Sequence, residues 1–388
     1  MSTALRRLVL ALSVWQFQSN AACLSAAENF MLKNNLKSLW KYRVPLLGIL
    51  SIATALVLAF AWTGGFLGTG ITTKAFLGDS LDNFPAGYRR AHGKGMCFTG
   101  TFHASGAAVP LSTSRIFLPA NIPAVGRFSI GTVDPHAADN STATVSMALM
   151  LTGDDKSQWR MKLNNEPYFA TRDAEGFLAQ VEAFEPVAAT GQLAPDKVAA
   201  FFQKYPEARK SVEREANATW PASFAGTEYN SINAFLLIAA DGKLQPVRWS
   251  MRPRAPVEML SKEAHAQASH DFLFDEITQR VGVAPLYWDL VFQLAEAGDP
   301  VNDPSQPWPS NRKEVIAGTL EVNQLVEQTH GACRDINFDP TLVPSGIALS
   351  DDPVLAARAG IYSQSYNARL REIGFGKATD AVGNKEIK

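Results

Sequence analysis

Residues 357–369 read ARAGIYSQSYNAR, a stretch that places two tyrosines between two arginines. In a helix, one face would carry four polar residues at i, i+4, i+7 and i+11: Arg358, Tyr362, Ser365 and Arg369. A packing face is normally apolar, whereas this one sets a tyrosine between two arginines. A cation one turn away favours the phenolate, and a phenolate is a hard anionic ligand for ferric iron. A solvent-exposed face with snorkelling arginines would show the same pattern.

The composition is that of an ordinary globular protein, with 46% hydrophobic and 19% charged residues in a chain of 388. The formal net charge of -1 argues against a nucleic-acid-binding protein, which would carry a basic excess. The three cysteines, Cys23, Cys97 and Cys333, show neither a C-x-x-C motif nor zinc-ligand spacing. Cys97 and Cys333 can pair or remain thiols, and we favour two buried thiols because free cysteine packs well in cores.

The N-terminal part of the chain contains a long apolar run. Residues 44–67 hold no charged side chain and are long enough to span a bilayer. The segment before this run is basic, with four cations and no acidic residue after Met31: Lys33, Lys37, Lys41 and Arg43. The positive-inside rule then predicts a cytoplasmic segment at 1–43 and a single-pass inner-membrane anchor at 44–67. The domain that follows is expected on the periplasmic side.

Two other interpretations of the N-terminal part stay open. The tripeptide Ala59-Phe60-Ala61 fits the small-x-small pattern of a cleaved export signal, which would release the protein into the periplasm. The apolar run is long for a cleavable signal, so we favour the uncleaved anchor. Because residues 6–15 form a second basic-then-apolar run, translation could also start at Met31, which would make residues 1–30 a wrong start.

Residues 75–388 are expected to form one α+β domain. Strand-like runs occur at 98–102, 124–130, 142–151, 234–239 and 246–251. Asp241-Gly242 predicts a hairpin between the last two runs. Helical periodicity occurs at 174–184, 195–205, 206–217, 270–281 and 353–373. Strands that pair locally in the first half, with helices between them and after them, favour an antiparallel sheet or barrel. The proline-rich stretch 299–309 is expected to be an ordered connection whose Trp308 packs onto the domain.

Three further stretches hold polar residues of chemical interest. The stretch RRAHGKG at 89–95 precedes the first strand, and its glycines allow a close approach of the backbone. Within the strand at 124–130, Arg127 and Ser129 share one face while Phe128 points to the other. The stretch LNNEPYF at 163–169 is typical of a turn and is followed by Phe177. Taken singly, each of them is explained as well by a surface or core position.

Taken together and in order, these stretches resemble the haem catalase family. The five matching motifs are RxxHxKG at 89–95, RFS at 127–129, NNxPxF at 164–169, FDP…PxGI at 338–347 and RxxxY at 358–362. The resemblance covers about residues 75–372 and is to the small, membrane-leader-bearing branch called catalase-related peroxidases. It implies an antiparallel β-barrel of the haem catalase type with inserted and C-terminal helices, without the arm and the extra C-terminal domain.

The resemblance implies haem b as the cofactor, with its iron bound by the protein from one side. Tyr362 would be the iron ligand, tyrosine being the known proximal ligand of catalases. Arg358 would hydrogen-bond the phenolate of that tyrosine and keep it ionised. The two haem propionates would be held by three guanidinium groups, those of Arg89, Arg127 and Arg369. Tyr366 lies off the polar face of the helix and is interpreted as ordinary packing.

On the other side of the haem, the resemblance implies a peroxide site. His92 would act as general acid–base, and Ser129 would hydrogen-bond its second imidazole nitrogen. Asn164 would orient the peroxide, and Phe177 would stack near the haem and exclude water. The substrates would be hydrogen peroxide, or an organic hydroperoxide, and an unidentified organic reductant. A homo-oligomer smaller than the tetramer typical of the family is expected.

Several functions are compatible with this pattern. The chain has Gly93, Ala170 and Ala174 where typical catalases carry alanine, phenylalanine and proline, and these changes fall on the peroxide side. Mainly because of the branch that the chain resembles, and only weakly because of Gly93 and Ala170, we favour a peroxidase of oxidative-stress defence that retains at most weak catalase activity. A true catalase, a converter of fatty-acid hydroperoxides, a non-catalytic haem carrier and a membrane-tethered protein without cofactor are the alternatives. The joint presence of His92, Ser129 and Asn164 argues against the haem carrier.

Overall fold

The computed structural model describes residues 43–63, 85–187 and 190–374 of the chain. They belong to two units, which divide between Gly70 and Ile71, and each unit is described by itself. The first contains helix α2, Arg43–Thr63. Within the described residues, no helix is long and apolar enough to cross a membrane. Residues 1–42 and 64–67 of the predicted segment and anchor lie outside the described residues, and membrane anchoring stays a prediction.

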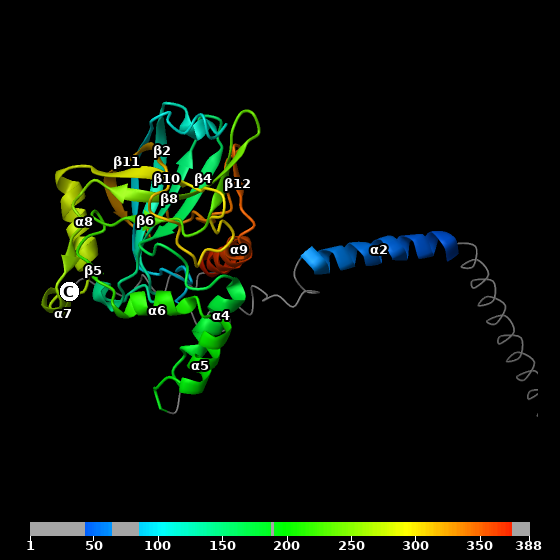
Figure 1. Ribbon diagram of the computed structural model, residues 1–388, viewed down its shortest axis with the longest axis horizontal. Helices are drawn as coiled ribbons and strands as arrows, with labels where there is room; N and C mark the ends of the chain where they lie inside the picture. The colour runs from blue at the N-terminus through cyan, green and yellow to red at the C-terminus, as the bar shows by residue number, and fades with distance from the viewer. Residues whose placement is uncertain (1–42, 64–84, 188–189, 375–388) are drawn as a thin grey trace, which may run out of the picture. The chain divides into compact units, whose positions relative to one another are not determined.

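The second unit is built on a closed antiparallel β-barrel (Figure 1). Its ring of strands runs β8-β10-β11-β1-β2-β3-β4-β6 and returns to β8, which pairs with both β10 and β6. The strands are β1 Gly95–Ala104, β2 Asn121–Ile130, β3 Val145–Thr152, β4 Gln158–Asn164, β6 Tyr229–Asn230, β8 Leu244–Pro253, β10 Leu286–Leu294 and β11 Glu314–Glu327. Two more strands, β7 Phe235–Ile238 and β12 Ile347–Leu349, extend the sheet from β8. A separate ribbon pairs β5 Trp220–Pro221 with β9 Met259–Leu260. The predicted α+β barrel is confirmed.

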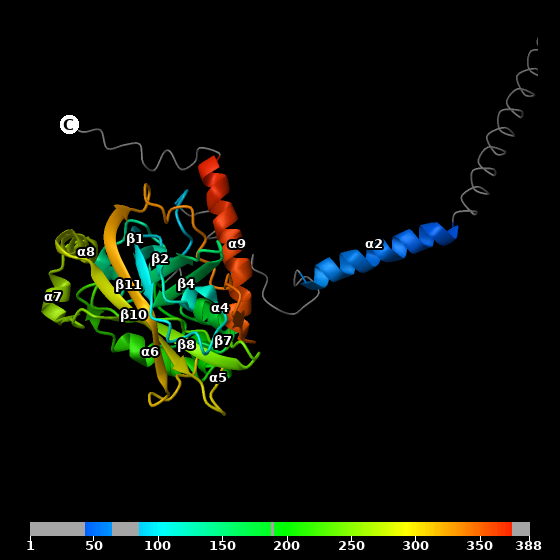
Figure 2. The ribbon, with the colours of Figure 1, turned by 90° about the horizontal axis from the view of Figure 1, so that it is seen from above.

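Helices are inserted between the barrel strands in the chain, and one more follows the last barrel strand. They are α4 Ala174–Ala183, α5 Pro195–Lys204, α6 Ala208–Ala216, α7 Lys262–Ala266, α8 Phe272–Val283 and α9 Pro353–Gly374, with short 3-10 turns at Arg115–Phe117 and Asp139–Ser141. Apart from the five-residue α7, each lies where helical periodicity predicts it. The longest, α9, runs along the outside of the barrel (Figure 2). The predicted hairpin is also present, with Gly242 at φ 82° between β7 and β8.

The barrel interior is filled by aromatic side chains. Phe128 lies 4.7 Å from Phe98 and 5.6 Å from Trp288 between ring centroids, and all three are fully buried. Because successive residues of a strand point to opposite faces, Arg127 and Ser129 point away from this core. In β4, buried and partly exposed residues alternate along the whole strand. The outer wall of the barrel therefore carries polar side chains at fixed positions.

The sequence did not reveal how the barrel closes. β10 and β11 lie in the second half of the domain, and β11 pairs with β1 from Met96–Glu327 to Ala104–Gly318. The expectation that strands lie in the first half and pair locally was wrong in this respect, because the ring closes only through a contact between distant parts of the chain. Trp308 packs as predicted, with the Arg248 guanidinium 4.8 Å from its ring centroid.

A disulfide joins the first strand to the segment that follows β11. Cys97 and Cys333 are bonded, with their Cα atoms 5.3 Å apart, so the preference for two buried thiols was wrong. Glycine at position 331 permits the contact, because a Cβ there would collide with the Cys97 side chain. The two cysteines are 236 residues apart in the chain, a separation at which spacing alone carries no pairing information.

We expect the disulfide to stabilise the domain. Replacing Cys97 and Cys333 together by alanine should lower the free energy of unfolding by about 2–4 kcal/mol, because the unfolded chain loses a long covalent loop. Urea unfolding monitored by circular dichroism measures the difference. Ser310→Ala, at an exposed position of the same domain, is the control and should leave the unfolding midpoint unchanged. Equal midpoints for the double variant and the wild type would contradict a stabilising role.

Candidate active site

A cavity of about 380 Å³ lies on the outer wall of the barrel, between that wall and α9. All nine residues that the sequence singled out line this cavity: Arg89, His92, Arg127, Ser129, Asn164, Phe177, Arg358, Tyr362 and Arg369. They come from the loop before β1, from β2, β4, α4 and α9. The barrel wall thus supplies one side of the site and α9 the other.

The α9 side of the cavity is organised by a chain of hydrogen bonds. Arg358 donates from Nη2 to the Tyr362 hydroxyl oxygen at 3.0 Å and from Nη1 to the Asn233 amide oxygen at 2.6 Å. Asn233 in turn donates to Asp352 Oδ2 at 2.7 Å. Asn233 and Asp352 are fully buried. Arg358 is therefore held against the phenol oxygen of Tyr362, as predicted from the helical spacing.

Asp352 also begins the helix that carries Tyr362. Its Oδ1 accepts from the Val354 N–H at 2.8 Å, which satisfies one of the free amides of the first turn. Burial raises the pKa of the Asp352 carboxyl, and the hydrogen bonds from Asn233, Leu355 and Val354 oppose that rise. Asp352 and Asn233 were not among the site residues predicted from the sequence. An aspartate directly before Pro353 at a helix start was the available signal.

His92 lies on the opposite side of the cavity, in a left-handed backbone conformation with φ 55°. The amide of Gly93 donates to the Thr132 carbonyl at 2.8 Å, and a Cβ on Gly93 would collide with the Val133 carbonyl oxygen. Burial lowers the pKa of His92 well below its ordinary value, and the nearby cations Lys162 and Arg127 lower it further. The imidazole is therefore neutral at neutral pH and can accept a proton.

The hydroxyl beside the imidazole belongs to a different serine from the predicted one. His92 Nδ1 lies 3.2 Å from the Ser146 Oγ, whereas the Ser129 Oγ is buried with no hydrogen-bond partner among the described residues. Ser129 and Ser146 face each other across β2 and β3. In this structure the hydroxyl beside His92 Nδ1 therefore belongs to the strand paired with the one that carries the predicted Ser129.

The remaining wall on the His92 side holds an amide and two aromatic rings. Asn164 accepts from the Glu166 N–H through Oδ1 at 3.0 Å, which leaves its amide N–H group to donate into the cavity. The rings of Phe169 and Phe177 lie 5.1 Å apart. Phe169 is fixed through its backbone, whose N–H donates to the Pro304 carbonyl at 2.8 Å.

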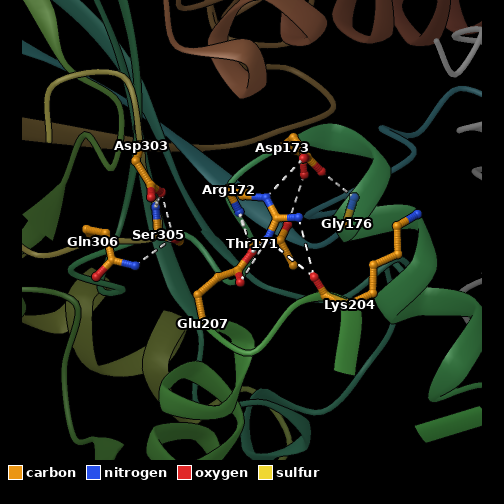
Figure 3. Close-up of polar contacts among 9 residues, drawn as sticks. All are labelled: Thr171, Arg172, Asp173, Gly176, Lys204, Glu207, Asp303, Ser305 and Gln306. Carbon is orange, nitrogen blue, oxygen red and sulfur yellow. Dashed lines mark hydrogen bonds and ion pairs between the residues drawn. The ribbon is translucent and has the colours of Figure 1, made fainter. Parts of the chain in front are cut away.

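A polar network secures the start of α4, which carries Phe177 (Figure 3). Arg172 donates to both carboxylate oxygens of Glu207, at 2.9 and 3.0 Å, and its guanidinium lies 4.8 Å from the Tyr205 ring centroid. Asp173 caps the helix by accepting from the Gly176 N–H at 2.6 Å. These contacts tie α4 to the loop before α6, so the aromatic wall has a rigid support.

The cavity is rich in positive charge. Six lining residues are cationic, Arg89, Arg90, Arg127, Lys162, Arg358 and Arg369, and among the described residues that line it none is Asp or Glu. Arg89 donates to the carbonyls of Cys333 at 3.0 Å and Ile336 at 2.8 Å. Arg127 donates to Gln328 Oε1 at 2.6 Å and to the Gly93 carbonyl at 3.0 Å. Neutral acceptors alone do not balance buried charge, so the cavity is suited to an anionic ligand.

The pKa values of these guanidinium groups reflect their crowding. Burial lowers the pKa of Arg127 to about 9, and the neighbouring Arg369 contributes to the shift. Burial lowers the pKa of Arg369 as well, and its Nε has no hydrogen-bond partner among the described residues. Tyr366 also lines the cavity, with its ring 5.4 Å from the Arg369 guanidinium and its hydroxyl donating to the Asp335 carbonyl at 2.9 Å. It is therefore part of the site wall, and its interpretation as ordinary packing was wrong.

The fold has counterparts among solved structures. A bacterial catalase superposes with a TM-score of 0.64 at 20% identity, over 74% of this chain and 58% of that one. A fungal catalase superposes with a TM-score of 0.66 at 18% identity, over 74% of this chain and 60% of that one. The barrel with its cavity against a long helix therefore defines a protein of the catalase fold.

Sequence comparison identifies the family. The family model for catalase matches residues 82–375. A catalase-related peroxidase of Synechococcus elongatus is 34% identical over 80% of this chain and 92% of its own length, and one of Mycolicibacterium paratuberculosis is 34% identical over 73% and 89%. A catalase of Pseudomonas syringae is 26% identical over 74% of this chain and 58% of its own length. The chain belongs to the catalase family and is a peroxide-handling oxidoreductase.

The hydrogen bonds around Asn233 lead to a prediction about stability. Asn233→Ala should lower the free energy of unfolding by about 1–3 kcal/mol, because Arg358 and Asp352 each lose a buried partner. Urea unfolding monitored by circular dichroism measures the loss. Asn367→Ala on the exposed face of α9 is the control and should change stability by less than about 0.5 kcal/mol. Equal losses in the two variants would show that the chain of hydrogen bonds adds nothing.

Proposed function

We propose that this protein is a haem-dependent peroxidase, which reduces hydrogen peroxide or an organic hydroperoxide with electrons from an organic donor. The observation that carries the proposal is the pairing of two groups across one cationic cavity. Tyr362, with Arg358 donating to its oxygen, lies on one side, and the neutral imidazole of His92 lies on the other. An anionic iron ligand and a proton acceptor are the two groups that would serve haem-based peroxide reduction.

The residues of the cavity fit haem b. The two propionates would meet Arg89, Arg127 and Arg369, and the unpartnered Nε of Arg369 is a donor that such a carboxylate would satisfy. Tyr362 would supply an oxygen ligand to the iron, with Arg358 favouring its ionised form. Phe177 would pack on the apolar ring system. When bound, the haem would supply the redox-active iron that receives the oxidising equivalents of the peroxide.

The protein's own part in the reaction is the movement of protons. His92 would take the proton from one peroxide oxygen and return it to the other, which leaves as water or as an alcohol. Ser146 at Nδ1 would hold the ring so that Nε2 faces the substrate. Asn164 would donate its amide N–H to the peroxide and orient it. The donor supplies two electrons and two protons per peroxide, so the sum of the reaction is balanced.

Donor oxidation is proposed over peroxide dismutation on the basis of the relatives. The two relatives at 34% identity, which match along most of their length, are both named catalase-related peroxidase. The relatives named catalase are less similar, and the chain spans 58% of the length of the one from Pseudomonas syringae. The presence of His92 and Asn164 opposite Tyr362 supports an enzyme over a haem carrier, because a carrier needs no group that moves a proton.

We also propose that the enzyme works outside the cytoplasm, tethered by the predicted anchor at 44–67. The disulfide between Cys97 and Cys333 supports this location, because structural disulfides persist in oxidising compartments and are rare in the cytosol. Signal cleavage in place of tethering would leave the same catalytic domain in the periplasm.

Tyr362→Phe tests the iron ligand. The variant should lose haem or show a strongly shifted Soret band, because phenylalanine has no oxygen to offer the iron. Absorption spectra of wild type and variant, purified in parallel and reconstituted with haem, make the comparison. Tyr366→Phe, one turn further along α9 on the wall of the same cavity, is the matched control and should retain the wild-type spectrum. An unchanged spectrum for Tyr362→Phe would disprove the assignment.

His92→Ala tests the proton acceptor. The variant should bind haem with an unchanged Soret band and lose about 10²–10⁴-fold in peroxide-dependent oxidation of a dye donor, the range expected for a general acid–base. The exposed His330→Ala is the control. Oxygen release measured beside dye oxidation, at equal peroxide, should be the slower process in the wild type. Oxygen release that exceeds dye oxidation would instead identify a true catalase.

A further inference from the structure

One cation in the cavity has no part in the proposed function. Lys162 lies on β4, two residues before Asn164 and on the same face of the strand, opposite Ala148 of β3. All three residues line the cavity. Its Nζ has almost no solvent-accessible surface and no hydrogen-bond partner among the described residues. An amine enclosed in this way lacks the acceptor that a charged lysine needs.

The other cations of the cavity already have partners. Arg90 forms an ion pair with Glu372, and Arg358 is engaged by Tyr362 and Asn233. The three remaining guanidinium groups are matched to the two carboxylates of a haem. None of the described lining residues is Asp or Glu, so the cavity wall offers Lys162 no counter-ion. A further anion on this side of the cavity would stabilise the charged form of the lysine.

Lys162 belongs to the His92 side of the cavity. Lys162 and His92 both line this cavity, and after burial the charge of Lys162 is the largest cause of the lowered pKa of His92. The pKa of Lys162 itself is lowered well below its ordinary value by burial and by the cations Arg127, Arg358 and Arg89. An arriving anion would oppose both effects and favour the charged ammonium. Anion binding at this position is therefore coupled to the part of the site where peroxide reacts.

We propose that Lys162 forms an anion-binding subsite beside His92 that receives the carboxylate of an organic substrate. This inference rests on the proposed function and specifies the substrate class of the same site. A carboxylate suits the position because an ammonium and the free amide N–H of Asn164 lie on one strand face, so both can donate to one small planar anion. The carboxylate can come from an acidic hydroperoxide or from an acidic electron donor.

The test compares two ligands of equal shape and different charge. Acetate and acetamide are titrated into the ferric, haem-loaded protein, and their dissociation constants are read from the perturbation of the Soret band. Lys162→Met, a neutral side chain of similar length, should weaken acetate binding about tenfold or more, the loss expected for one charge-assisted hydrogen bond. Acetamide binding should change less than about twofold, because no ion pair is lost. Lys162→Arg keeps the charge and should retain acetate binding close to the wild-type value.

Each other outcome of this titration overturns the subsite. Equal weakening of acetate and acetamide would indicate a structural role, and unchanged acetate binding would indicate that Lys162 meets no anion. Loss of haem from Lys162→Met but not from Lys162→Arg would assign the lysine to a propionate instead. These results are distinct from failure of the proposed function, which would appear as an unchanged spectrum in Tyr362→Phe.

A kinetic arm identifies the source of the carboxylate. The ratio of kcat/KM for a carboxylate-bearing hydroperoxide to that for cumene hydroperoxide is compared in wild type and Lys162→Met. The same ratio is measured for an acidic and a neutral aromatic donor. A fall in the first ratio places the carboxylate on the oxidant, and a fall in the second places it on the donor. If neither ratio falls, Lys162 does not select an anionic substrate.

Discussion

Burial of positive charge around Tyr362 is the constraint on which the rest of the site depends. Each buried guanidinium needs hydrogen-bond acceptors, and many of the acceptors here are neutral oxygens. Arg89 is held by backbone carbonyls at Cys333 and Ile336. The disulfide to Cys97 fixes one end of that carbonyl segment on the barrel wall. A covalent bond that stabilises the fold therefore also keeps a cation in place at the cavity.

Successive side chains of a β-strand point to opposite faces, so one barrel wall borders both the hydrophobic core and the cavity. Phe128 lies in the aromatic core, while its neighbours Arg127 and Ser129 face the cavity. β4 repeats the arrangement, with Leu163 buried in the core between Lys162 and Asn164. Because the core residues are closely packed, the polar side chains between them have little freedom to move. Hydrophobic packing on the other side of the same strands therefore fixes the positions of the polar side chains in the site.

Local features could be predicted from the sequence, whereas features that depend on contacts between distant segments could not. The register of Arg358, Tyr362 and Arg369 is a property of one helix, and it was readable because helical period is local. The closure of the barrel by β11, and the pairing of Cys97 with Cys333, depend on distant segments and leave no local pattern. The hydroxyl beside His92 belongs to Ser146 and not to the predicted Ser129, which faces it on the paired strand. Which of two paired residues meets a loop is not visible in the sequence. Lys162 was overlooked because a lysine in a strand is usually solvent-exposed.

Asp352 constrains the position of Tyr362 in two ways. The same carboxylate caps the first turn of α9 through Oδ1 and receives Asn233 through Oδ2. The helix fixes where the tyrosine lies, and the Asn233–Arg358 contacts fix what its oxygen meets. Both constraints depend on the buried Asp352 carboxylate, so a shift at the start of α9 would move the Tyr362 phenol and the Arg358 side chain together. A ligand bound by Tyr362 would therefore meet a fixed arrangement of Arg358 and Tyr362, because both side chains depend on Asp352.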